Sequence, residues 1–286
     1  MTAIAVFVPL SPAMPAANLD SAWSFGLNQS VAQGLSFGKE IIFTFGPYTS
    51  IYTRAYNPST DFIMLLGSIC LALSYWACCA LLIKGVKWYW ILSFCFFGLA
   101  SLTYNRDVLL FSYPLLVGLV CFKNAHNGKF SPYYFAILFA SLGLLPLVKG
   151  NTLILCAAIE VLCLVFFIVN KQTRLALVAL LTSLVSMLFF WSLSGQSVAN
   201  LPDYFINMAP IISGFTEAMA VNGSTREIVF YLITAISLLI VISIQRQINV
   251  ISKIFLFCIY FCLLPSRPVL SDTVAVMSSS PVVPYL

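Results

Sequence analysis

The 286-residue chain is 61% hydrophobic and only 8% charged, and its mean hydropathy is +0.99. Soluble globular domains carry about a quarter of charged residues, so this composition excludes a chain that presents an ordinary water-facing surface. The formal net charge of +5 is too small to indicate a nucleic-acid-binding protein, and we expect no nucleic-acid partner.

The apolar residues form continuous runs, as in membrane-spanning helices. Inside lipid every backbone N–H and C=O must be paired within the protein, which leaves helices or closed barrels, and barrel strands would alternate apolar with polar residues. A helical span needs roughly 20 apolar residues. The sequence therefore predicts an all-α polytopic transmembrane bundle, a single domain over 1–286 with about nine spans. The spans are expected over Thr2–Ala17, Phe62–Ile83, Trp88–Tyr104, Val108–Phe122, Tyr133–Val148, Thr152–Val169, Leu175–Leu193, Ile228–Ile244 and Asn249–Leu264.

The segments between these spans differ in charge. Those on one side contain basic residues and no acidic ones: Lys84, Lys87, Lys123, Lys129, Lys171, Arg174 and Arg246. Short basic loops face the cytoplasm. We therefore expect a multi-pass protein of the bacterial inner (plasma) membrane whose two long loops, over 18–61 and 194–227, lie on the outer side.

The first outer loop, over 18–61, is expected to be folded. Trp23, Leu27, Val31 and Leu35 recur every four residues and predict an interfacial helix over about 21–33 with one apolar face. Asp20 or Ser21 is expected to cap its start and Gly34 to end it. An extended Ile41–Phe45 and a turn at Gly46-Pro47 should follow.

Two stretches of sequence resemble a known superfamily. They are LDSAWSFGLNQSVAQGLSFGKEIIFTFGPYTSIY, in the first outer loop, and LPDYFINMAPIISGFTEAM at 201–219. In the first stretch the order of acid, helix, glycine and aromatic, proline-containing turn is similar to the first outer loop of GT-C membrane glycosyltransferases. Both stretches resemble an uncharacterised bacterial group of GT-C-like membrane proteins. The resemblance spans about residues 15–260, although only the two stretches are specific. It implies transfer of a sugar from a polyprenyl-phosphate donor to an acceptor on the outer face of the membrane.

The resemblance also implies site residues. Asp20 would be the general base, with Asp107 as its acidic partner, and a divalent cation between them is the one cofactor to consider. Arg106, Lys149 and Arg54 would lie near the phosphate, and Tyr48 near the substrate. Membrane lipid and the lipid-linked sugar are the expected partners.

Each of these residues also has a simple structural explanation. Asp20 is a good helix N-cap, and Asp107 is an acid favoured by the dipole at the start of a span. Lys149, in the short Lys149-Gly150-Asn151 link between two spans, is equally consistent with a lysine whose charge extends to the membrane surface. The pattern alone does not decide between the two sets of roles.

Glu160 is the one acidic residue in the middle of a predicted span, where an ionisable group is costly and by default indicates a functional site. It supports a second hypothesis, a transporter or flippase-like protein. A third hypothesis is a non-catalytic membrane subunit. The tail over 265–286 has no helical periodicity and is typical of a truncated or out-of-frame terminus, so an inactive fragment of a glycosyltransferase is also considered.

The charge distribution predicts the topology. A reporter fused after Lys87 or Lys129 should report a cytoplasmic position, because the basic loops resist translocation. A reporter fused after Asn200 should report a periplasmic position. Alkaline phosphatase and fluorescent-protein fusions measure this directly. The reverse pattern would contradict the predicted orientation.

Overall fold

The computed structural model describes residues 6–14, 16, 18–93, 106–125, 132–218, 225–244, 253–254 and 256–258. Over these residues the protein is all-helical and contains no β-strand, only isolated backbone bridges. The chain divides into two compact units, Met1–Ile212 and Ser213–Leu286. Each unit is described separately.

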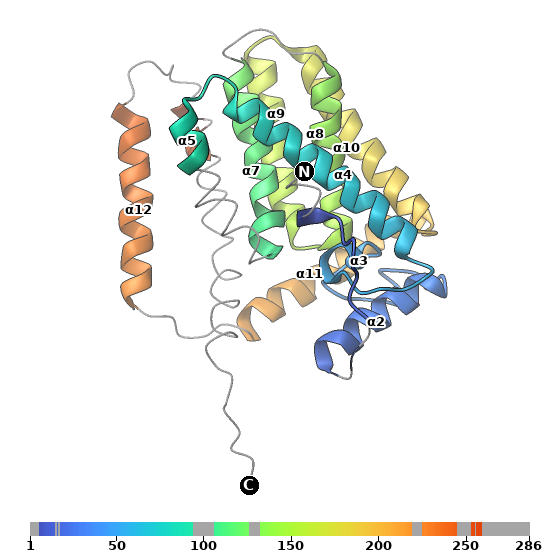
Figure 1. The fold of residues 1–286 in the computed structure, drawn as a ribbon. Helices are drawn as coiled ribbons and strands as arrows, with labels where there is room; N and C mark the ends of the chain where they lie inside the picture. Colours follow the sequence, from blue (N-terminus) through green and yellow to red (C-terminus); the bar gives the residue numbers. More distant parts are fainter. Residues whose placement is uncertain are drawn as a thin grey trace. The chain divides into compact units, whose positions relative to one another are not determined.

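The first unit is a helical bundle with folded segments at one end (Figure 1). The bundle consists of α4 (Asp61–Ile83), α7 (Arg106–Ala125), α8 (Pro132–Val148), α9 (Thr152–Val169) and α10 (Thr173–Leu193). The other elements are α2 (Leu19–Ala32), α3 (Thr49–Thr53), α5 (Trp88–Ser93), η2 (Val198–Asn200) and the start of α11 (Leu201–Ala218). In Figure 1, α2, α3 and the start of α11 lie beyond the same end of the bundle.

The second unit contains α12 (Thr225–Ile244). Three hydroxyl side chains of this helix donate to the carbonyl four residues earlier: Thr234, Ser237 and Ser243. These bonds pair polar side chains within an otherwise apolar helix, which suits an environment without water.

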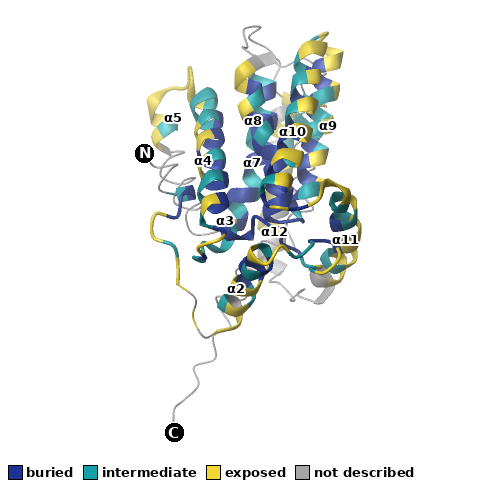
Figure 2. Ribbon diagram, turned by 90° about the vertical axis from the view of Figure 1, so that its right-hand side faces the viewer, coloured by how far each residue is buried: buried dark blue, intermediate teal, exposed yellow. Residues whose placement is uncertain are grey.

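Four of the bundle helices, α4, α8, α9 and α10, carry exposed large apolar residues as well as buried ones (Figure 2). On α10, Leu177, Leu181 and Val185 are exposed, whereas Ala179 and Ser183 are buried. Over 177–185 of α10, the smaller residues therefore lie in the helix contacts and the larger aliphatic residues lie on the outer face. This inverted arrangement is expected when the surrounding solvent is lipid.

Three of the described helices are long and apolar enough to cross a membrane, judged by length and composition: Asp61–Ile83, Thr152–Val169 and Thr173–Leu193. A shorter apolar helix covers Tyr133–Val148. The expected spans over 62–83, 108–122, 133–148, 152–169, 175–193 and 228–244 all fall within helices. Those over 88–104 and 249–264 lie largely outside the described residues.

The expected helical span over 2–17 is corrected by the structure. Residues 8–14 are irregular, and Ala13 instead pairs with the first outer loop: its N–H donates to Arg54 O at 2.8 Å, and its carbonyl accepts from Tyr56 N–H at 2.8 Å. Pro9 and Pro12 explain the difference, because proline lacks an N–H and clashes with the preceding helical turn.

The predicted interfacial helix is present as α2, but its cap is not the one expected. Asn18, rather than Asp20 or Ser21, is the N-cap, and its Oδ1 accepts from Ser21 N–H at 2.8 Å. The helix ends before Gly34, whose φ of +69° is readily adopted only by glycine. Leu27 is buried on the inner face, as the four-residue spacing predicted.

Close approach of α8 and α10 depends on small residues. Ser186 Oγ donates to Ala140 O at 2.6 Å, and a Cβ added to Gly143 would collide with the backbone of α10 at Ser183. In lipid, the hydrophobic effect does not drive two helices together, so contacts at this interface must hold them. The close approach of the two backbones allows both van der Waals packing and this interhelical hydrogen bond.

We predict that Gly143→Ala lowers the free energy of unfolding by about 1–3 kcal/mol, because the added methyl group overpacks the α8–α10 contact. Thermal unfolding in detergent measures it. Gly26→Ala is the matched control: it is also helical, has nothing within 4 Å of an added Cβ, and should stabilise α2 slightly. Equal effects of the two substitutions would contradict the packing account.

Candidate functional site

The C-terminal end of α8 is the point at which two segments, 18–61 and 194–212, attach to the bundle, and we call them the outer segments after their predicted side. The last carbonyls of a helix have no partner within it. Here Val148 O accepts from Gly46 N–H at 3.3 Å and Leu147 O from Tyr48 N–H at 3.1 Å. The first outer loop therefore completes the backbone pairing of α8.

A side chain from the second outer segment completes the same helix end. Gly150 N–H, which a continuing helix would direct to Pro146 O, donates instead to Thr44 O at 2.8 Å. Pro146 O accepts the hydroxyl of Tyr204, on α11, at 3.1 Å. Three successive carbonyls of α8 are thus paired with residues that are distant in the sequence.

The two outer segments also bind each other. Gln196 accepts from Phe37 N–H at 2.9 Å and donates through Nε2 to Leu35 O at 3.0 Å. Asn207 Nδ2 donates to Gly38 O at 2.7 Å. Gly38 has a φ of +92°, and a Cβ there would collide with the backbone of Tyr204. Only glycine allows this approach.

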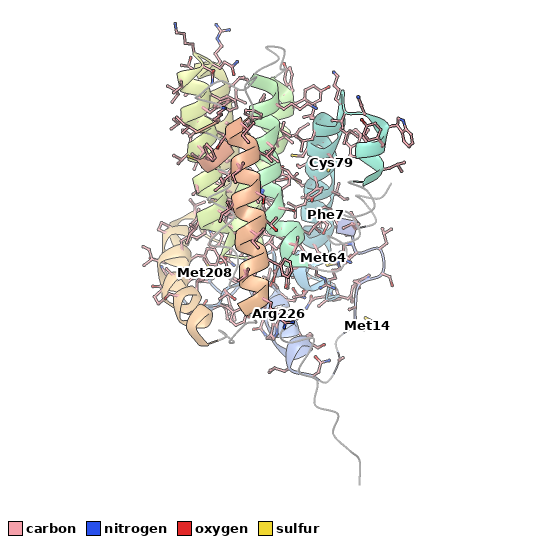
Figure 3. The ribbon with its side chains drawn as sticks, turned by 90° about the vertical axis from the view of Figure 1, so that its left-hand side faces the viewer. Phe7, Met14, Met64, Cys79, Met208 and Arg226 are labelled. Carbon is pink, nitrogen blue, oxygen red and sulfur yellow. The ribbon has the colours of Figure 1, made fainter. Side chains whose placement is uncertain are left out.

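The contacts are also close where α11 meets the link between α8 and α9. A Cβ at Gly150 would collide with the side chain of Met208, which Figure 3 labels on α11. A Cβ at Gly46 would collide with Leu147 O and come within 2.6 Å of the Tyr204 hydroxyl. The end of the bundle is therefore tightly packed.

A buried ion pair lies at this end of the bundle. Lys149 Nζ is 2.6 Å from Asp107 Oδ1, and the two side chains are only 9% and 11% exposed. Lys149 follows α8, whereas Asp107 is in the first turn of α7. Because desolvating either charge alone is costly, the pair holds these two helix ends in one arrangement.

Aromatic rings surround the Lys149 ammonium group. Nζ lies 5.2 Å from the centroid of Phe45 and 5.0 Å from that of Tyr52, within the range of cation–π attraction. The two rings contact each other, with centroids 4.9 Å apart. Lys149 is thus enclosed by the first outer loop and is not an exposed cation.

Two arginines lie beside this pair. Arg106 Nη1 donates to Tyr52 O at 2.6 Å and to Thr53 O at 3.3 Å, which are the last carbonyls of α3. Arg54, the C-cap of α3, adopts a left-handed backbone with φ of 56° and donates from Nη2 to Val6 O. Burial, and then the charge of Arg106, lower the pKa of Arg54.

The arginine pair is not neutralised within the described part of the chain. The ion pairs there are Lys149–Asp107 and Lys39–Asp203, so neither Arg54 nor Arg106 contacts a carboxylate in these residues. Arg54 Nε is buried and has no hydrogen-bond partner among them. Two guanidinium groups whose charges interact therefore share a region to which an anion would be attracted.

Tyr48, expected near the substrate, is instead fully buried. Its hydroxyl donates to Phe190 O, at the end of α10, at 2.9 Å, and its ring packs edge-on against that of Phe190. Burial raises the pKa of the Tyr48 hydroxyl. The side chain fastens the loop to α10 and leaves no surface for a ligand in this structure.

The remaining predicted residues lie outside this cluster or outside the described side chains. Asp20 is in the first turn of α2, but its side chain is not among those described, so its expected approach to Asp107 falls outside the described residues. Glu160 accepts from the hydroxyl of Ser183 and so links α9 to α10. It lies eight residues beyond Thr152, about 12 Å along the helix.

Several residues of the site carried little signal in the sequence. Phe45 and Tyr52, which enclose Lys149, were visible only as part of an aromatic-rich stretch. Gln196 and Tyr204, which bind the first loop, are more than 140 positions away from their partners Phe37 and Gly46. Among the described residues no group of three or more potential metal ligands comes together.

No family model matches the chain, and neither a curated protein nor a solved structure matches it. The resemblance to GT-C glycosyltransferases therefore remains an expectation from two stretches of sequence. The arrangement of Asp107, Lys149 and the two arginines is the structural observation available to test it.

We predict that Lys149→Met lowers the free energy of unfolding by about 3–5 kcal/mol, because the buried carboxylate of Asp107 would lose the cation that neutralises it. Adding Asp107→Asn should recover a large part of that loss. A double-mutant cycle from thermal unfolding in detergent measures the coupling.

The exposed pair Lys39–Asp203, with side chains 54% and 41% exposed, provides the control. Lys39→Met should cost no more than about 1 kcal/mol. If Lys149→Met were equally mild, the pair would not organise the helix ends.

Proposed function

We propose that the protein is a polytopic inner-membrane glycosyltransferase, similar to the GT-C enzymes, with about nine spans and its site on the outer side. It would transfer a sugar from a polyprenyl-phosphate donor to an acceptor. Three helices able to cross a membrane support the setting. The basic loops support the orientation, and the two sequence stretches support the class of reaction.

The Arg54–Arg106 pair, which contacts no carboxylate among the described residues, is the observation that carries the proposal. A donor of this kind presents a phosphate near the membrane surface, and guanidinium groups bind phosphate with paired, charge-assisted hydrogen bonds. Arg106 is exposed, and among the described residues only its Nη1 atom is hydrogen-bonded. Its remaining donors contact no other described residue and are the ones proposed to bind a ligand.

Lys149 and Asp107 take different roles from those first expected. Because they neutralise each other and are buried, we assign them as positioning residues that hold Tyr52, and with it the Arg106 contact, in place. A direct phosphate contact by Lys149, or a cation held by Asp107, would require this ion pair to open.

In the proposed reaction the acceptor hydroxyl loses its proton to the carboxylate of Asp20. The acceptor oxygen forms a bond to the sugar carbon while the bond from that carbon to the phosphate oxygen breaks. The phosphate leaves with the bonding electron pair, and the arginine pair stabilises the resulting charge. No step requires another reactant.

No specific observation favours a transporter. Glu160 is the residue on which that hypothesis depends, and its bond to Ser183 gives it a partner at the α9–α10 contact. A hydrogen bond between helices is an ordinary role for a polar side chain within a membrane.

Binding of polyprenyl phosphate to the protein in nanodiscs tests the anion site. Arg106→Gln should weaken binding about 10- to 100-fold, since a charged hydrogen bond contributes about 1.5–3 kcal/mol. Arg106→Lys keeps the charge and should weaken it less. Arg174→Gln, an exposed arginine in a predicted cytoplasmic loop, should have no effect.

A turnover assay in membrane vesicles separates catalysis from binding. Asp20→Asn should lower loss of labelled hexose from the donor in membrane vesicles by about 10²–10⁴-fold without changing polyprenyl phosphate binding. Glu160→Gln should leave both intact. Full turnover in Asp20→Asn together with a loss in Glu160→Gln would overturn the proposal in favour of a transporter.

A further inference from the structure

A cluster of aromatic rings on the outer segments is only partly buried. Trp23 on α2, Phe43 in the loop and Tyr52 on α3 each retain exposed surface. All three contact Phe45, which is buried between them, with ring centroids 5.2, 6.0 and 4.9 Å away respectively. We call Trp23, Phe43 and Tyr52 the aromatic face.

The rings of this face are held in defined orientations. Trp23 and Phe43 are each inclined by 25° to the ring of Phe45 and by 39° to each other, whereas Tyr52 is inclined by 50° to Phe45. Trp23 and Phe43 also contact each other, with centroids 5.8 Å apart. Lys149 fixes the centre of the cluster through Phe45 and Tyr52. Such rings lose little conformational freedom when a ligand packs on them.

The aromatic face adjoins the arginine pair. The ring of Tyr52 belongs to the face, while its backbone carbonyl accepts from Arg106 Nη1 at 2.6 Å. Arg54 follows two residues later at the C-cap of α3. A ligand whose phosphate lies at the arginines would therefore have its neighbouring group within reach of these rings.

The geometry favours a sugar ring over an apolar chain as the neighbouring group. The C–H groups on one side of a pyranose form a flat, weakly positive surface that packs against the negative face of an aromatic ring. An isoprenoid chain needs apolar volume but does not need exposed ring faces held in fixed planes. Aromatic residues are also frequent at membrane interfaces, but that preference explains neither the stacking of Trp23 and Phe43 on Phe45 nor the contact of Phe45 and Tyr52 with the buried ammonium group.

We propose that Trp23, Phe43 and Tyr52 form the subsite for the pyranose ring of a sugar linked to a lipid phosphate. The proposal rests on the phosphate site proposed above and adds the part of the substrate that the aromatic face recognises. Sugar affinity then resides in Trp23 and Phe43, and phosphate affinity in Arg54 and Arg106.

Two kinds of probe separate these contributions in nanodiscs. One is polyprenyl phosphate, and the other is polyprenyl phosphate linked to glucose, mannose, galactose or N-acetylglucosamine. At least one glycosylated probe should bind the unmodified protein about 3- to 10-fold more tightly than polyprenyl phosphate. Trp23→Ala and Phe43→Ala should each remove that difference, and Trp23→Phe should retain part of it.

Phe25→Ala is the matched control, because Phe25 is an exposed aromatic residue on the same helix and makes no contact with this cluster among the described ring pairs. It should preserve the difference. Unchanged melting temperatures would show that the variants are folded. If Trp23→Ala unfolds the protein, Phe43→Ala, which lies in the loop, decides the matter.

The alternative results are distinguishable. If no glycosylated probe binds more tightly than polyprenyl phosphate, the sugar subsite is wrong and the phosphate site stands. Equal weakening of all probes by Trp23→Ala and Phe43→Ala would assign the face to the isoprenoid chain and overturn the inference. If polyprenyl phosphate itself does not bind the unmodified protein, the proposed function fails, and the subsite fails with it.

Discussion

The end of α8 is the constraint on which the outer half of the first unit depends. A helix that stops inside an apolar environment leaves carbonyls whose desolvation is costly unless they find donors. Here those donors are Gly46, Tyr48 and the hydroxyl of Tyr204. Backbone pairing of one helix thus requires two outer segments to fold against it, and their folding brings the candidate site together.

Donors for the last carbonyls of a helix are also found at the ends of α3, α10 and α4. The last carbonyls of α3 accept from Arg106, and one at the end of α10 accepts from Tyr48. At the end of α4 the ammonium of Lys123 donates to Leu81, Leu82 and Lys84 carbonyls at 3.1, 2.6 and 2.6 Å. Positive side chains suit these positions, because the helix dipole is negative there. Arg106 and Lys123 thus pair with carbonyls at helix ends, and Arg106 does so even though a role in substrate binding is proposed for it.

The cations of the candidate site fall into two groups, according to whether a carboxylate contacts them. Lys149 has a buried carboxylate and two aromatic rings as partners, so its charge is fully accommodated inside the protein. Arg54 and Arg106 contact only carbonyls in the described part of the chain, and carbonyls do not cancel a charge. The proposed phosphate site therefore lies with the arginines, although Lys149 was an equal candidate in the sequence.

The sequence by itself determined the helical class, the position of α2 and most of the bundle helices, because continuous apolar runs and a four-residue spacing are local properties of the chain. It identified Asp107, Arg54, Arg106 and Lys149 as residues of interest. It did not show that Asp107 and Lys149 pair, that Tyr48 is buried, or that Asn18 caps α2. The Asp107–Lys149 pair and the burial of Tyr48 were decided only by the tertiary structure, because each joins segments far apart in the sequence. Asn18 caps α2 through Ser21, only three residues away, but the sequence offered several residues able to cap there. The donors for the last carbonyls of α8 come from a loop about 100 residues earlier and from α11, 58 residues after the acceptor, a relation that no local pattern records.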